Sequence, residues 1–153
     1  VFFYVGLVLT LSQGMIVRRL STRVSPKSLA TAGTLLMVVG LALIGVAGQQ
    51  ESEKLLYGVI PIAIVGFACV TPALQSLLSL KASADRQGMV LGVGQSMSAL
   101  ARIVGPLIAF PLHYRAVELP HWVGSGLMIV GLLLVLTLTA PETKADSEPE
   151  TAG

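Results

Sequence analysis

Charged residues are scarce in this sequence. Asp, Glu, Lys and Arg make up 12% of its 153 residues, whereas they make up about 25% of an ordinary soluble domain. Hydrophobic residues account for 54%. A chain this short and this apolar lacks the polar surface to cover a water-soluble core, which argues against a soluble globular domain. Its formal net charge of +2 is also too small to indicate a nucleic-acid partner.

Cysteine and histidine are equally rare. Cys69 is the single cysteine, so no disulfide can form within the chain. His113 and His121 are too few and too far apart for a metal site, and they are interpreted as loop histidines. No phosphate-binding glycine loop and no nucleophile–base set is present. The sequence therefore gives no support for catalysis, and we expect no metal and no cofactor.

Long apolar runs are what the sequence has in abundance. A helix needs about 20 apolar residues to cross a bilayer core of about 30 Å. Four runs reach that length and the first is slightly shorter, and none alternates as membrane-barrel strands do. A soluble bundle of buried helices is the disfavoured alternative. The prediction is an all-α membrane protein, an antiparallel bundle of five transmembrane helices over about residues 1–17, 29–48, 55–80, 88–112 and 122–140.

The first residue, Val1, is not a methionine and already lies inside an apolar run. No positively charged segment precedes it, which disfavours a signal peptide. We therefore expect a fragment of a longer protein, with the N-terminal part missing from this sequence.

Basic residues are distributed unevenly over the connections, and they tend to stay on the cytoplasmic side. Residues 18–28 and 81–87 hold six of them, whereas 49–54 and 113–121 hold one each. The first two connections are therefore predicted to be cytoplasmic and the other two external. The tail, residues 141–153, then lies in the cytoplasm. It contains prolines and no large apolar side chain, so we expect it to be disordered.

The segment 88–112 combines two side-chain patterns. Small residues recur at spacings of four, four and three, on one helix face suited to close packing: Gly88, Gly92, Ser96 and Ala99. A polar stripe runs beside that face, formed by Gln95, Ser98 and Arg102. Gly105, Pro106 and Pro111 follow, and we expect them to bend or loosen the outer half of the helix.

Arg102 is the only charged residue within the five predicted spans. It lies roughly 21 Å along the helix from Gly88, near the middle of the membrane. An arginine there costs roughly 2.5–3.5 kcal/mol on insertion scales, so it should face a partner or a water-filled cavity. Two interpretations stay open. Arg102 attracts anionic substrate groups or pairs with a carboxylate in a gating contact, or it is structural, capping carbonyls freed by Pro106 or extending to the interface.

The segment 55–80 has a polar stripe on its cytoplasmic half. The stripe consists of Thr71, Gln75 and Ser79 at spacings of four, with Ser76 alongside. Pro61 and Pro72 interrupt this helix, as is common where membrane helices line a cavity. The alternative is that the stripe serves helix–helix hydrogen bonding.

Two segments have little polar chemistry. The segments 29–48 and 122–140 hold glycines and aliphatic residues, and they are predicted to be outer helices that face lipid. Trp122 is predicted to lie at the outer boundary of the membrane, where an indole ring is favoured.

Two stretches carry a family resemblance: QGMIVRRLSTRVSPKSL at 13–29 and GMVLGVGQSMSALARIVGPLIAFPL at 88–112. They resemble the loop between helices eight and nine and helix eleven of the major facilitator superfamily, in particular its drug:proton antiporters, which include tetracycline efflux proteins. Gly14, Arg19 and Arg23 match the loop motif, whereas Arg18 replaces its acid and Ser21 its glycine. Gly105-Pro106 resembles the glycine–proline motif of helix five, without the glycines that follow it there.

The resemblance implies that residues 1–140 are helices eight to twelve, part of the C-terminal half of a transporter. It implies alternating access, export of a small, partly apolar molecule or drug against protons, and partnership with the missing N-terminal half in a lipid bilayer, expected to be the plasma membrane. In that fold, helices eight, ten and eleven face the central path and nine and twelve lie outside. Two alternatives stay open: a membrane scaffold that transports nothing, and an importer or symporter on the same fold.

The candidate site residues follow from the polar stripes and from the resemblance. The substrate-cavity candidates are Thr71, Gln75, Gln95, Ser98 and Arg102, and the kink or gating candidates are Pro72, Gly105 and Pro106. The cytoplasmic loop motif is Gly14, Arg19 and Arg23, and the packing face includes Gly88, Gly92 and Ser96. No span holds a carboxylate, so the proton carrier is expected in the N-terminal half.

Overall fold

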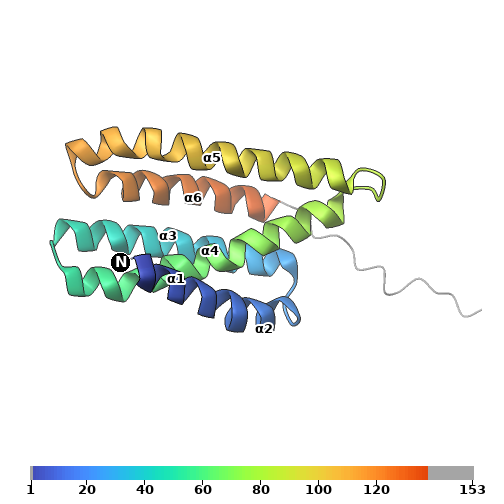
Figure 1. The fold of residues 1–153 in the computed structure, drawn as a ribbon, viewed down its shortest axis with the longest axis horizontal. Coiled ribbons are helices and arrows are strands. Elements are labelled where there is room, and N and C mark those ends of the chain that lie inside the picture. Colours follow the sequence, from blue (N-terminus) through green and yellow to red (C-terminus); the bar gives the residue numbers. More distant parts are fainter. Residues whose placement is uncertain (1, 138–153) are drawn as a thin grey trace, which may run out of the picture.

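The computed structural model describes residues 2–137. Over that range the chain forms helices joined by short connections and contains no strand (Figure 1). The predicted all-α membrane fold is therefore confirmed. Four helices are long and apolar enough to cross a membrane: α3 (Pro26–Gln49), α4 (Glu53–Lys81), α5 (Gln87–Arg115) and α6 (Leu119–Thr137). The predicted tail, 141–153, and residues 138–140 of the last predicted span lie outside the described residues.

The first predicted span, 1–17, lies in a helical run of three pieces that continues to Ser21, four residues into the predicted connection. These are α1 (Phe2–Leu11), the π-helix η1 (Ser12–Val17) and α2 (Arg18–Ser21). The Ser12 hydroxyl donates to the Val8 carbonyl at 2.6 Å, and Gly14, a poor helix former, lies in the widened segment. Both features loosen the ordinary helical turn at the point where the π-helix begins.

α3 and α4 begin two or three residues before their predicted starts, because a serine caps each of them. Ser25 Oγ accepts from the Ser28 amide at 3.2 Å, and Pro26 occupies the first turn of α3. Ser52 Oγ accepts from the Leu55 amide at 3.4 Å at the start of α4. These polar first turns lie outside the apolar runs.

α3 and α4 cross at close range. A Cβ atom built on Gly40 would lie 2.6 Å from the Ala63 amide nitrogen, and one built on Gly66 would lie 2.7 Å from the Gly33 carbonyl oxygen. Small residues let two backbones approach this closely in a membrane, where close packing replaces the hydrophobic effect between helices. The buried core continues along this crossing with Leu29, Ala30, Ala68, Cys69, Ala73 and Leu77, and Val17 and Val135 join it.

α6 packs against another side of α3. Ser125 Oγ donates to the Val38 carbonyl at 3.1 Å, and the Trp122 ring covers Gly45. α3 is therefore more enclosed than the prediction of an outer helix implied. Exposed Leu35 and Val39 still give it an apolar outer face.

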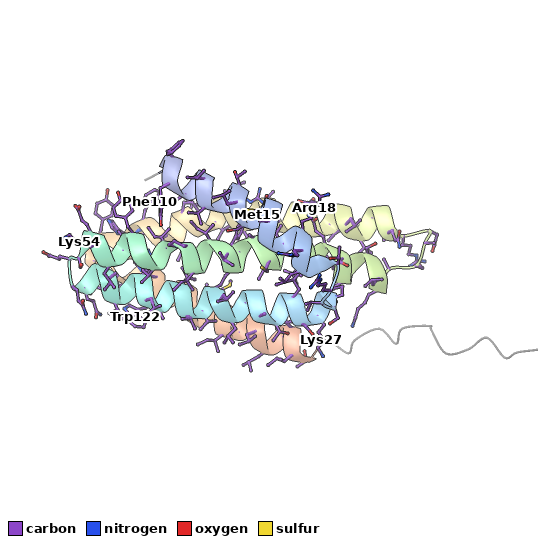
Figure 2. The ribbon with its side chains drawn as sticks, turned by 90° about the horizontal axis from the view of Figure 1, so that it is seen from below. Met15, Arg18, Lys27, Lys54, Phe110 and Trp122 are labelled. Atoms are coloured by element: carbon purple, nitrogen blue, oxygen red, sulfur yellow. The ribbon has the colours of Figure 1, made fainter. Side chains whose placement is uncertain are left out.

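The connections alternate between the two ends of the bundle, as predicted for an antiparallel arrangement. The connection after α2 and the one between α4 and α5 lie at one end, and the other two connections lie at the opposite end (Figure 1). Accordingly, Lys27 and Lys54 lie far apart along the molecule (Figure 2).

Candidate functional site

α5 carries most of the candidate site residues and has no buried residue along its described length. It touches α4 near the connecting loop, where a Cβ built on Gly94 would lie 2.9 Å from Leu78 Cδ1. Close by, Gln87 Nε2 donates to the Ser79 carbonyl at 3.2 Å. From this shared end α4 runs obliquely toward α1 and α3, whereas α5 stays beside α6 (Figure 1). The two helices with polar stripes therefore meet at one end and diverge from it.

The two polar stripes lie at matching levels along this pair. Gln75 and Ser98 lie about one turn beyond the α4–α5 contact, and Thr71 and Arg102 lie about two turns beyond it. Gln95 comes directly after the contact on α5, and its side chain is exposed, like those of Gln75 and Ser98. No hydrogen bond links the stripes within residues 2–137. The two stripes therefore lie at the same heights along α4 and α5, but they do not form an enclosed site within residues 2–137.

Arg102 lies near the midpoint of α5, and its side chain is exposed. Over the described range the guanidinium makes no hydrogen bond and no ion pair, so the carbonyl-capping interpretation is not realised among these residues. Pro106 has no amide hydrogen, so the Arg102 carbonyl also lacks its usual donor one turn later. The only charge in this predicted span is therefore exposed and has no hydrogen-bond or ion-pair partner within residues 2–137.

The hydroxyl group of Thr71 forms its hydrogen bond within its own helix. Its hydroxyl donates to the Phe67 carbonyl at 3.1 Å, so it makes no bond to a neighbouring helix in the described part of the chain. Pro72 lies next to it, and α4 continues through this proline as one helix. α5 likewise continues through Gly105, Pro106 and Pro111. The expected loosening does not break either helix.

The small-residue face of α5 has no neighbour among the described helices. No atom lies within 4 Å of a Cβ built on Gly88 or Gly92, and the Ser96 hydroxyl donates at 3.0 Å to the Gly92 carbonyl of its own helix. Gly94, which does touch α4, is about 200° around the helix from Gly92. The predicted packing of this face stays a prediction about a partner outside residues 2–137.

The three residues of the loop motif are distributed over consecutive elements. Gly14 lies in the π-helix, Arg19 in α2, and Arg23 in the connection after α2. The Arg23 amide donates to the Leu20 carbonyl at 2.9 Å, which closes the turn. The motif therefore forms one continuous basic end of the first helical run.

Sequence reasoning missed two features. The Tyr4 hydroxyl of α1 donates to the Tyr57 carbonyl of α4 at 2.9 Å. The sequence signal for this bond is Pro61, which lacks the amide hydrogen that would otherwise bond to the Tyr57 carbonyl. A hollow of about 510 Å³ lies at the opposite end from the basic loop, lined in part by Glu51, Glu53 and Glu118. None of the predicted site residues lines it.

The sequence profile of the Major Facilitator Superfamily matches residues 1–152. Major facilitator superfamily domain-containing protein 10 of Mus musculus is 28% identical over 150 residues, covering 96% of this chain and 32% of that protein. The protein of the same name from Homo sapiens is 29% identical over 148 residues, with 96% and 32% covered. The quinolone resistance protein NorA of Staphylococcus aureus strain MRSA252 is 32% identical over 72 residues, which cover 47% of this chain and 18% of that protein.

The chain spans about a third of the length of the mouse and human relatives. No solved structure matches it.

Proposed function

Because this chain belongs to the Major Facilitator Superfamily, we propose that it forms part of a secondary active transporter that works by alternating access. It is an integral, multi-pass membrane protein with a small-molecule substrate. Two halves of such a transporter rock around a site near the middle of the membrane. The observation that carries the proposal is Arg102, an exposed charged side chain halfway along an apolar helix, in line with the polar residues Gln95 and Ser98.

The described helices contribute one wall of the substrate path in this proposal. Gln95 and Ser98 offer hydrogen bonds along α5, and Thr71 and Gln75 offer them at matching levels on α4. Arg102 attracts an anionic substrate group or a carboxylate of the facing half. Pro72 and Pro106 each leave a backbone carbonyl without a donor, and Gly105 has a low helix propensity. Both features make these helices easier to deform during the transport cycle.

More specifically, the proposed transport is export by proton antiport. Its support is the similarity to a protein named for quinolone resistance, together with the likeness of 13–29 and 88–112 to drug:proton antiporters. The exported molecule is small and partly apolar, because the stripes alternate with exposed aliphatic side chains such as Met97 and Ile103. The proton carrier belongs to the rest of the polypeptide, since the five predicted spans contain no carboxylate.

The proposed setting is the plasma membrane, with the connections 18–28 and 81–87 and the C-terminus in the cytoplasm. The support is the difference in basic residues between the two ends of the bundle. The small-residue face of α5 packs on the rest of the transporter.

Reconstitution of the full-length protein in liposomes tests the function. We expect an imposed proton gradient to drive a fluorescent anionic or zwitterionic dye across the membrane in the direction opposite to proton flow, and a protonophore to abolish the movement. Movement of the substrate together with protons would instead indicate a symporter. A full-length protein that moves no substrate under any gradient would support the scaffold alternative.

A further inference from the structure

A hollow of about 350 Å³ lies at the basic end of the first helical run, and it is called here the basic hollow. It is lined by Gly14, Met15, Arg18, Arg19 and Thr22. Gly14 leaves room in it, because no atom lies within 4 Å of a Cβ built there. The π-helix widens the helical turn at the same place. π-helical segments of this kind are frequent at functional sites.

The two sides of the basic hollow differ in chemistry. Met15 is 68% exposed and lies on the side of the apolar run, whereas Arg18 and Arg19 lie one turn closer to the connection (Figure 2). The Thr22 hydroxyl is already used, because it donates to the Arg19 carbonyl at 3.1 Å. An apolar wall next to two guanidinium groups matches the boundary between the acyl chains and the phosphate of a phospholipid.

Among residues 2–137, acidic residues are scarce at this end of the molecule. The sequence contains no Asp or Glu before Glu51, which lies at the opposite end of the bundle. The acid that the described residues place at the basic end is Asp85, and its carboxylate lies 3.6 Å from the Arg86 guanidinium. A basic cluster directly next to a membrane span attracts anionic lipid, and arginine binds phosphate with a planar pair of donors.

We propose that the basic hollow binds the phosphate of an anionic phospholipid in the adjacent leaflet, with the acyl chain beside Met15. Arg19, with Arg18 next to it, holds the phosphate, and the space at Gly14 admits the glycerol region of the headgroup. This site is separate from the transport path along α4 and α5, and it does not depend on the proposed substrate.

The test measures lipid binding by the full-length protein in nanodiscs that contain phosphatidylglycerol and phosphatidylcholine. Bound phosphatidylglycerol is counted by native mass spectrometry after release into detergent. We expect the variant Arg18→Gln/Arg19→Gln to lose affinity for phosphatidylglycerol by roughly five-fold for each arginine. The control Arg115→Gln, at the opposite end of the bundle, should retain it. Equal phosphatidylglycerol binding by all three proteins would overturn the proposal.

A second variant separates the hollow from a diffuse attraction to basic charge. Gly14→Leu fills the space and leaves every charge in place, so we expect it to lower phosphatidylglycerol binding as well. Thermal unfolding of the same samples shows whether the variant is folded, and Gly6→Leu, another site with no atom within 4 Å, controls for the larger side chain. Unchanged binding by folded Gly14→Leu would overturn the hollow as the site. Full displacement of the lipid by inorganic phosphate alone would overturn the lipid as its ligand.

Discussion

The Tyr4 hydroxyl donates to the Tyr57 carbonyl at 2.9 Å, and this carbonyl is the one that Pro61 leaves without a helical donor. The two tyrosine rings also meet edge to face, with centroids 5.7 Å apart and planes at 76°. A backbone bond lost inside α4 is thus replaced by a side chain of α1. The replacement joins the first helical run to α4 at the end opposite the basic hollow.

Tyr4→Phe should destabilise the protein by about 0.5–1.5 kcal/mol, because it removes the donor and keeps the ring. The measurement is the free energy of unfolding of the full-length protein in detergent. Tyr114→Phe is the matched control, since Tyr114 is 89% exposed. Equal stability of Tyr4→Phe and the parent protein would show that the bond contributes nothing.

Pro61→Ala restores an amide hydrogen opposite the Tyr57 carbonyl. In that background the cost of Tyr4→Phe should fall by about half or more, because the carbonyl then has a donor within its own helix. A double-mutant cycle measures this coupling directly. Additive effects of the two substitutions would contradict the link between Pro61 and Tyr4.

The crossing of α3 and α4 should be intolerant of an added methyl group. Gly40→Ala places a carbon within 2.6–2.8 Å of Ala63 atoms, two of them backbone, so the helices must separate. We expect a loss of about 1–3 kcal/mol, the usual cost of overpacking a tight contact. Thermal unfolding of the full-length protein provides the measurement.

Gly126→Ala is the control for that substitution. No atom lies within 4 Å of a Cβ at Gly126, and alanine favours a helix over glycine by about 1 kcal/mol. Its stability should equal or exceed that of the parent protein. If both glycines tolerate alanine equally, the close crossing is not a determinant of stability.

The number and order of the long helices could be predicted from the sequence because the length of an apolar run reports the thickness of the bilayer. The helix ends were displaced for a physical reason. Hydropathy counts apolar residues, whereas a helix also includes its polar first turn, which Ser25 and Ser52 stabilise as caps. Hydropathy also treats Ser12 and Gly14 as ordinary members of a span, so it does not reveal the π-helix.

Which helix faces meet was harder to predict. Regular spacing shows that small residues share a face, but it does not identify the helix that covers it. Gly33 and Gly40 face α4 at close range, whereas Gly88 and Gly92, with a cleaner spacing, face none of the described helices. The polar stripes could be located from the sequence. Their relative position could not, because it depends on how far α4 and α5 diverge.

The proposed orientation can be tested with cysteine labelling. Gln50 and Ala84 are exposed residues in connections at opposite ends of the bundle. In a full-length protein whose native cysteines are replaced, Gln50→Cys should react with a membrane-impermeant maleimide on intact cells. Ala84→Cys should react only after permeabilisation. The reverse pattern would place the basic connections outside the cell.

Arg102→Ala should lower transport by the full-length protein about ten- to a hundredfold, the effect of removing a charged hydrogen-bond partner worth about 1.5–3 kcal/mol. Removing an intramembrane charge also eases insertion, so the amount of protein in the membrane should not fall. Arg102→Lys keeps the charge and should retain part of the activity, because lysine lacks the planar fork of arginine. Arg115→Ala, in the last turn of the same helix, is the matched control and should transport normally. The exposed guanidinium of Arg102 has no partner within residues 2–137, so the loss of a structural contact there would not explain reduced transport. Normal transport by Arg102→Ala would remove this arginine from the mechanism.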